Sequence, residues 1–481
     1  MNQADIYAAL PLIILSGTGL LILLWSAFAS SASRIPFLLT IAGAGAAAVF
    51  AGMNMGASHD AALGGLLFNN GYSNFFTILF CAAVILTVLL AERYLEEVQT
   101  LIGEFCALIL FSSAGMVMMA SGADLLVIFL GLETMSIAFY VLAGFFRSKT
   151  ESNEAALKYF LLGAFATGFF LYGIALIYGS LGSMNLIKIA SMTSPVPWSA
   201  MLVLGLVLLI VGFAFKVAAF PFHQWAPDVY EGSPTIVAGF MSTAGKAAAF
   251  SALIVIFSSI PVSVLSGNAE KIQIIISVLA ALSMLYGNIV ALSQTKIKRM
   301  LAYSSTAHAG YLLLGVASLS LSGAAGVAIY AAVYLLMQIA AFGIVAMLER
   351  ETGSGLELTD FTGLAKKRPY AALLMAIIML SLAGIPPFAG FFGKYYLFLA
   401  AINSGMTWLA IVGVISSIIA SYFYLRVIVL MYFRDPVGSD DGAIAKESNI
   451  SYIAIGLASV ALIVLGLMPG LLTDAAGYVF K

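Results

Sequence analysis

Five ionisable residues lie within apolar stretches of the chain. Three are lysines: Lys216 in GFAFKVAAF, Lys246 in STAGKAAAF and Lys394 in AGFFGKYYLF. The other two are Glu133 in LGLETMSIAF and His308 in SSTAHAGYLL. An ionisable side chain in lipid costs about 2.5–3.5 kcal/mol on insertion scales, so such residues face the protein interior or water. All three residue types can take up and release protons, and proton transfer is therefore the chemistry that this set indicates.

The lysines differ in the partners that the sequence offers them. Glu133 could pair with Lys216, either as part of a proton-transfer site or as a purely structural ion pair. Lys246 and Lys394 have no spare carboxylate nearby in the sequence. Burial without such a partner disfavours the charged form of an amine. We therefore expect Lys246 and Lys394 to be able to accept and release protons.

Other polar residues in or near apolar stretches have simpler alternatives. Lys158 lies close to the start of an apolar segment, where snorkelling to the membrane surface explains it as well as a function does. His223 follows Pro221 in FPFHQWAP and could merely hydrogen-bond backbone groups freed by a helix break. His308 could be a core histidine whose ring nitrogens are satisfied. Lys158 and His223 are thus accessory candidates for a proton path.

The composition places these residues in a membrane. Of the 481 residues, 62% are hydrophobic and 9% are charged, with a mean hydropathy of +1.07 and a net charge of -1. Soluble domains carry roughly 25% charged residues, so the chain is predicted to be an all-α polytopic membrane protein.

The charge balance gives no indication of nucleic-acid binding. Cys81 and Cys106 match no metal or redox spacing, and the start MNQAD lacks the basic region of a cleavable signal peptide.

About fourteen segments meet the length of about 20 apolar residues that a membrane span requires. They cover residues 6–28, 35–54, 74–91, 104–120, 124–146, 154–178, 199–221, 235–258, 272–293, 299–318, 323–348, 370–400, 405–432 and 451–475.

Two of these segments should be broken within the membrane. Segment 12 is too long for one span and contains GIPPFAG, and segment 7 runs into Pro221 and continues as FHQWAPDVY. Breaks five segments apart predict two five-helix repeats, segments 4–8 and 9–13, and an odd repeat length inverts the second copy. The predicted units are residues 1–100, 101–260, 261–435 and 436–481, of which the middle two are the repeats.

The basic residues predict the orientation, because Lys and Arg accumulate on the inner side of the membrane. With the N-terminus outside, Lys188, Lys271 and Lys481 lie outside. Only Lys216, Lys246 and Lys394 fit neither surface, and both termini should face outward. The residues predicted to lie inside are Arg34, Arg93, Arg147, Lys149, Lys158, Lys296, Lys298, Arg299, Arg350, Lys366, Lys367, Arg368, Arg426, Arg434 and Lys446.

Three stretches resemble a known family. FKVAAFPFHQWAPDVYEGSPT, LSQTKIKRMLAYSSTAHAGYLLLG and LSLAGIPPFAGFFGKYYLF are similar to the antiporter-like membrane subunits of respiratory complex I, the NADH:quinone oxidoreductase. PFHQWAPDVYEGSPT is the most specific of the three and favours the NuoN-type branch of that family. The resemblance covers nearly the whole chain and is weakest in the first three segments and the tail.

This resemblance implies a proton-translocating subunit with no redox centre of its own. Flavin, iron–sulfur clusters and quinone would belong to partner subunits, and the neighbours would be other membrane-arm subunits and lipids in a bacterial inner membrane. By the same resemblance, Glu133 pairs with Lys216, Lys246 is the central connector, His308 lies between two half-channels, and Lys394 faces the outlet. His223 and Lys158 match family positions whose roles are less settled.

Two alternatives remain open from the sequence. The chain could be an Mrp-type cation/proton antiporter subunit, since that group shares the resemblance, or a structural scaffold whose polar residues only seat neighbours. A soluble-type enzyme is disfavoured, because the sequence contains no Walker A loop, no HExxH and no cysteine cluster for iron–sulfur.

Overall fold

The helical membrane fold predicted from the sequence is confirmed. The structure is a computed structural model that describes residues 3–28, 34–56, 59–98, 102–192, 200–261, 269–352, 356–435 and 449–479. In this part of the chain, 11 helices are long and apolar enough to cross a membrane. The remaining three predicted segments are the two broken ones and residues 299–318, and the count of fourteen spans stays a prediction.

The elements form a helical bundle with one small hairpin. Their bounds are α1 Gln3–Phe28, α2 Ile35–Met53, β1 His59–Ala62, β2 Leu67–Asn69, α3 Gly71–Val98, α4 Ile102–Ser121, α5 Leu125–Ala143, α6 Thr150–Leu181, α7 Leu186–Ala190, α8 Ala200–Lys216, α9 Trp225–Gly232, α10 Thr235–Phe240, η1 Met241–Gly245, α11 Lys246–Ser259, α12 Ala269–Leu292, α13 Ile297–Ala317, α14 Leu321–Thr352, η2 Leu358–Phe361, α15 Leu364–Lys367, α16 Pro369–Ala383, α17 Ala389–Asn403, α18 Thr407–Phe433, α19 Asn449–Leu467 and α20 Gly470–Val479.

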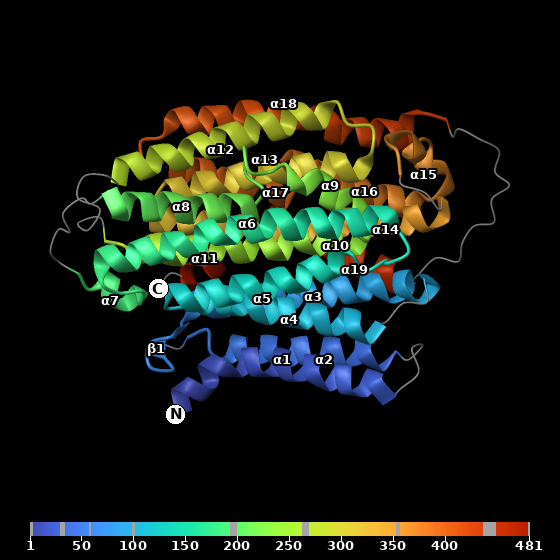
Figure 1. The fold of residues 1–481 in the computed structure, drawn as a ribbon. Coiled ribbons are helices and arrows are strands. Elements are labelled where there is room, and N and C mark those ends of the chain that lie inside the picture. The colour runs from blue at the N-terminus through green and yellow to red at the C-terminus, as the bar shows by residue number, and fades with distance from the viewer. Residues whose placement is uncertain are drawn as a thin grey trace.

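The helices lie side by side with their long axes roughly aligned (Figure 1). α1 and α2 form one flank against α3 and α4, and α12 and α18 pack together on the opposite flank. β1 and α7 lie at one end of the bundle and α15 at the other (Figure 1). We call these the outer and inner ends, after the orientation predicted from the basic residues. Lys446 and Lys481 from that prediction lie outside the described residues, as do the side chains of Arg93 and Arg350.

The first predicted break lies directly after Lys216, the last residue of α8. Ala218 has a φ of 54°, in the left-handed region. The amide of Ala218 donates to the Phe215 carbonyl at 3.0 Å, and that of Ala219 donates to the Ala214 carbonyl at 2.8 Å. This pair of bonds is the Schellman arrangement that closes a helix C-terminus. The chain resumes as α9 after Pro221.

The second break repeats this geometry in α16. Gly384 has a φ of 83°. The amide of Gly384 donates to the Ser381 carbonyl at 3.0 Å and that of Ile385 to the Leu380 carbonyl at 3.1 Å, so α16 closes with the same pair of bonds. α17 resumes at Ala389. The shared geometry supports the predicted internal repeat, which remains a prediction.

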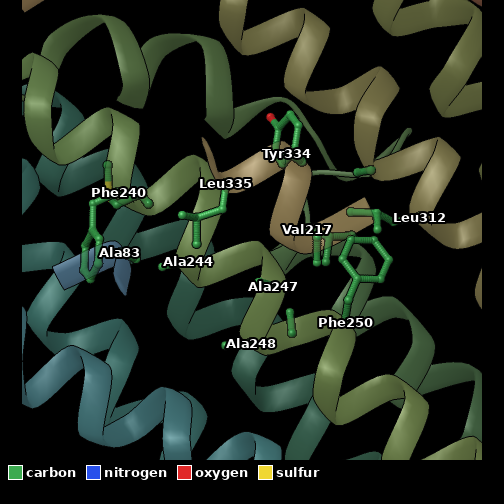
Figure 2. Packing of buried hydrophobic residues seen from close by; sticks show 14 of the residues in the cluster. Ala83, Val217, Phe240, Ala244, Ala247, Ala248, Phe250, Leu312, Tyr334 and Leu335 are labelled. Atoms are coloured by element: carbon green, nitrogen blue, oxygen red, sulfur yellow. The ribbon is translucent and has the colours of Figure 1, made fainter. Parts of the chain in front are cut away.

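The centre of the bundle is a helix that the sequence predicted as one regular span. The segment Thr235–Ser259 is 100% buried over its most apolar window, and it is interrupted by the π-helical η1 directly before Lys246. A π turn adds a residue per turn and rotates the helix beyond it, so η1 changes the direction in which Lys246 points. Figure 2 shows apolar side chains along this segment, with Phe240 and Ala244 before Lys246 and Ala247 and Phe250 after it.

Some irregular elements were not predicted. β1 and β2 form an antiparallel hairpin between α2 and α3, so the described chain is not wholly helical. The predicted segment 451–475 ends early, with α19 stopping at Leu467 and α20 starting as a separate helix at Gly470. Pro469 lies at this point and explains the interruption, because proline cannot continue the backbone hydrogen-bond ladder.

Ion pairs at the inner end join the two predicted repeats. Arg299 on α13 pairs with Asp228 at 2.9 Å and Glu231 at 2.8 Å, both on α9. Lys296 also contacts Glu231, at 2.5 Å. Lys158 on α6 pairs with Asp228 at 2.9 Å. The second half of the broken helix is thus fixed on two sides by charge-assisted hydrogen bonds.

Replacing Arg299 by alanine should loosen this junction. The substitution leaves two partly buried carboxylates with fewer donors and should cost about 1 kcal/mol, because the side chains are only partly shielded from water. We expect a lower level of assembled subunit in detergent-solubilised membranes. Lys366→Ala is the control, since its bond to Asp435 is at the surface and should contribute little. Equal assembly of both variants would contradict the bracing role.

Candidate functional site

Lys216 is buried at the end of α8, and no carboxylate of the described residues lies within 4.0 Å of its ammonium. Its ammonium donates to the Ser136 hydroxyl on α5 at 2.5 Å. It also lies over the rings of Tyr140 and Tyr159, at 5.4 Å and 5.6 Å from their centroids. The aromatic faces and the hydroxyl offset part of the cost of burying a cation. The partners of the amine are a hydroxyl and two aromatic rings, which carry no full charge. They therefore do not fix the amine in its protonated form.

Glu133, the predicted partner of Lys216, lies one helical turn before Ser136 on α5. It is half-buried and accepts a hydrogen bond from the Thr167 hydroxyl of α6 at 2.8 Å. Glu133 and Lys216 form no ion pair within 4.0 Å in the described structure, and the amine contacts Ser136 instead. Glu133 is nevertheless near enough to interact electrostatically with Lys216.

Lys246 connects the two predicted repeats. It is 1% exposed at the start of α11, and its ammonium donates to the Ser305 carbonyl on α13 at 2.7 Å. A backbone carbonyl accepts a hydrogen bond but carries no full charge. The contact therefore orients the amine without fixing it in the protonated form.

His308 lies on α13, one turn beyond Ser305. Its Nδ1 contacts the Tyr330 hydroxyl at 2.6 Å and its Nε2 contacts the Tyr424 hydroxyl at 3.0 Å. Tyr330 belongs to α14 and Tyr424 to α18, and both are fully buried. A histidine bonded through both ring nitrogens can pass a proton across its ring. The same two hydrogen bonds are also expected if His308 is only a structural core residue.

Lys394 lies on α17 against the end of α16. It donates to the carbonyls of Leu382 at 3.0 Å and Ala383 at 3.1 Å, and to the Ser417 hydroxyl at 2.9 Å. These two carbonyls are free because α16 ends there and its last carbonyls have no helical partner. The ammonium also lies 4.9 Å from the centroid of the Tyr311 ring. The second break thus supplies the acceptors for this lysine.

The two accessory candidates lie in different surroundings. His223 is 4% exposed in the first break, and its Nδ1 has no hydrogen-bond partner in the described structure. Its ring lies against Phe220 and Tyr286. Lys158 is part of the inner-end ion pairs, with a side chain that is 42% exposed. This position fits a surface bracing role better than a buried relay.

The proton-binding residues are surrounded by hydroxyl groups that sequence reasoning missed. Ser136 could have been found, since it lies three residues after Glu133 and so on the same helix face. Tyr140 and Tyr311 lie on the same helices as Glu133 and His308, at helical spacing from them. No sequence signal marks the others, because each comes from a helix far from its partner in the chain. They are Tyr159, Thr167, Tyr330, Ser417 and Tyr424.

The arrangement as a whole is a series of proton-binding groups across the centre of the bundle. Lys246 contacts α13 at Ser305, His308 lies one turn further along that helix, and Tyr311 on the same helix adjoins Lys394. Among the described residues, no group of three or more histidine, cysteine or carboxylate side chains could hold a metal ion. The chemistry that these side chains support is proton transfer.

By comparison with known proteins, this multi-pass bundle with two broken helices and buried lysines belongs to the class of antiporter-like membrane subunits. The family model described as "NADH:quinone oxidoreductase/Mrp antiporter, TM" matches residues 122–420. NADH-quinone oxidoreductase subunit N 1 of Chloroherpeton thalassium is 42% identical over 476 residues, covering 98% of this chain and 97% of that protein. The chain therefore belongs to the subunit N family of NADH-quinone oxidoreductases.

Solved structures agree with this assignment. A chain of respiratory complex I from Thermus thermophilus is 34% identical, with a TM-score of 0.79, and the match covers 97% of this chain and 99% of that one. A chain of the Mrp complex from Dietzia sp. has a TM-score of 0.86 at 21% identity, covering 98% and 97%. The second likeness shows the fold alone.

Gly384→Ala should disturb Lys394 selectively. A Cβ at Gly384 would lie 3.1 Å from Cδ and 3.2 Å from Nζ of Lys394, in addition to the strain of its positive φ. Gly405→Ala is the matched control, with a φ of 77° and open space around the added carbon. We expect proton-pumping turnover of the assembled complex to be roughly two- to tenfold lower for Gly384→Ala than for the control. Equal turnover would show that the position of Lys394 does not limit proton transfer.

Proposed function

We propose that this chain is a proton-translocating membrane-arm subunit of a bacterial NADH:quinone oxidoreductase. In this proposal, protons move through Lys216, Lys246, His308 and Lys394, and Glu133 controls the first step. The chain has no redox centre of its own; flavin, iron–sulfur clusters and quinone belong to partner subunits. It lies in the inner membrane with both termini on the outer side, beside other membrane-arm subunits and lipids.

One observation carries this proposal. Each of the three lysines is buried, and none forms an ion pair with a carboxylate within 4.0 Å in the described part of the chain. A lysine retained only for structure would be more stable with a bound carboxylate or replaced by an apolar residue. Amines held only by hydroxyls, carbonyls and rings can change charge without breaking an ion pair.

The mechanism depends on electrostatic coupling between neighbouring groups. A rearrangement in a neighbouring subunit moves negative charge toward or away from Lys216 through Glu133, which is half-buried. At 4 Å and an effective dielectric constant near 20, a charge pair is worth about 4 kcal/mol. That energy corresponds to roughly three pKa units, enough to drive a proton from Lys216 toward Lys246.

The second half of the transfer takes place around α13. When Lys216 becomes charged again, it repels the proton held by Lys246, which passes to His308, whose tyrosine partners give hydroxyl contacts on both sides of the ring. Lys394 then receives the proton and releases it toward the outer side when the next charge arrives. Each step needs only a change in the charge of the preceding group, because the amines keep neutral hydrogen-bond acceptors throughout.

Lys216→Ala in the assembled complex tests the first step. Removing the amine should slow proton transfer through this subunit by about 100-fold or more, the usual contribution of a proton-transferring side chain. The measurement is NADH-driven proton pumping and quinone reduction in proteoliposomes. Lys188→Ala is the control, since Lys188 is an exposed lysine on α7. If pumping and quinone reduction both stayed near wild type, Lys216 would not have this role.

Lys246→Ala separates a translocating subunit from a scaffold. If the subunit translocates protons, the variant assembles but pumps fewer protons per NADH oxidised, because the connection between the two halves is lost. A scaffold that only seats its neighbours would show the reverse, with less assembled complex and unchanged pumping per assembled complex. The two quantities are measured on the same preparation, from the subunit content of the purified complex and the proton yield of the same vesicles.

A further inference from the structure

Asn288 is a buried polar residue of α12 that the proton-transfer series does not include. It is 1% exposed, and its side-chain amide donates to the Ser416 carbonyl on α18 at 3.0 Å and to the Ser416 hydroxyl at 2.7 Å. The Ser416 hydroxyl donates in turn to the Met284 carbonyl on α12 at 2.8 Å. Three hydrogen bonds around Ser416 thus join α12 to α18, and the two helices lie side by side at one flank of the bundle (Figure 1).

Stability alone does not explain an asparagine at this point. Hydrogen bonds between membrane helices contribute little net stability, because an unassembled helix also finds partners for its polar groups. An apolar residue could fill the space between α12 and α18 without leaving a polar group to satisfy. The better-attested effect of a buried asparagine between two helices is to fix their register. Asn288 therefore sets the level at which Ser416 lies against α12.

The close contact between α12 and α13 fixes the other side of this arrangement. A Cβ at Gly287 on α12 would lie 2.7 Å from backbone atoms of Tyr303 and Ala307 on α13. A Cβ at Gly310 on α13 would lie 2.7 Å from a backbone nitrogen of α12. Glycines at both points allow the two backbones to touch, and touching backbones cannot slide past each other without a clash. Asn288 therefore aligns α18 with α12 and α13 together.

The groups that Asn288 aligns meet at Lys394. Ser417 follows Ser416 on α18, and its hydroxyl accepts a hydrogen bond from the Lys394 ammonium at 2.9 Å. The ring centroid of Tyr311 on α13 lies 4.9 Å from the same ammonium. The Tyr311 hydroxyl lies 3.4 Å from the Asn288 amide nitrogen and 3.4 Å from the Ser416 hydroxyl. Asn288 thus reaches the surroundings of the lysine on two sides, through α18 and through Tyr311.

We propose that Asn288 is a positioning residue for Lys394, which holds the Ser417 hydroxyl and the Tyr311 ring in place around the ammonium. The inference rests on the proposed function, because it concerns the last lysine of the series. Without the Asn288 amide, α18 loses two of the bonds that set its level, and the Ser417 hydroxyl moves relative to the amine. A shift of about 1 Å at a reacting group can lower a rate by about 100-fold, so a smaller shift still gives a measurable loss.

Asn288→Leu in the assembled complex tests this role. Leucine is branched like asparagine and removes the amide. We expect the proton-pumping turnover per assembled complex to be roughly two- to tenfold lower than wild type, measured in proteoliposomes with NADH as the donor. Asn74→Leu is the matched control. Asn74 is also buried, and its amide donates to backbone carbonyls near the start of α3, so its loss should leave turnover per complex near wild type. Equal turnover of the two variants would overturn the proposal.

Asn288→Gln separates positioning from space filling. Glutamine keeps the amide that donates to Ser416, and it should restore part of the turnover lost in Asn288→Leu. If the site only had to be filled, the apolar and similarly branched leucine would work at least as well as glutamine. Turnover of Asn288→Leu equal to or above that of Asn288→Gln would therefore contradict a positioning role.

A double-mutant cycle with Lys394→Ala tests whether Asn288 acts through the lysine. Once Lys394 is absent, Asn288→Leu should lower the turnover little further, because the group that it positions is gone. The same fold-loss with and without Lys394 would show that Asn288 acts elsewhere. Asn288→Ser, which keeps one donor, takes the place of Asn288→Leu in both experiments if the leucine variant does not assemble.

The cycle also distinguishes this inference from the proposed function. If Lys394→Ala lowers turnover and Asn288→Leu does not, the positioning role is wrong and the proposed function stands. If Lys394→Ala itself has no effect, the proposed function fails, and the inference fails with it.

Discussion

The structure depends on one constraint, which is that three amines must be buried in a membrane without carboxylates in contact with them. Each therefore needs neutral acceptors, and these are scarce in a transmembrane helix because most of its carbonyls already accept a backbone hydrogen bond. The second break solves this for Lys394 by exposing the carbonyls of Leu382 and Ala383. For Lys246 the acceptor is the Ser305 carbonyl, and η1 directs the amine toward α13. Lys216 uses the Ser136 hydroxyl and two aromatic rings.

The same constraint explains why α13 is the most polar of the central helices. It carries Lys298, Ser305 and His308 on one side, and it does not qualify as an apolar span by composition. Its other neighbours form a close-packed apolar shell, part of which Figure 2 shows around η1 and α11. A dry shell around a polar helix keeps the local dielectric low, and charge changes at one lysine are then felt strongly at the next.

The fold alone does not distinguish a complex I subunit from an Mrp subunit, since both kinds of structure match it closely. Function depends on the groups placed on a fold and on the partners that drive them. In the proposed mechanism the driving input arrives at Glu133, which is half-buried with Thr167 as its hydrogen-bond partner.

The sequence by itself determined the membrane class, the approximate spans and both helix breaks. Hydrophobic length and proline placement are local properties, and the cost of burying an amine singled out Lys216, Lys246 and Lys394 without any structure. Only the tertiary structure decided what holds them. The Ser305 carbonyl is 59 residues from Lys246, and the Tyr424 hydroxyl is 116 residues from His308. Such contacts arise when distant helices pack together, and a single sequence has no local pattern that records which faces will meet.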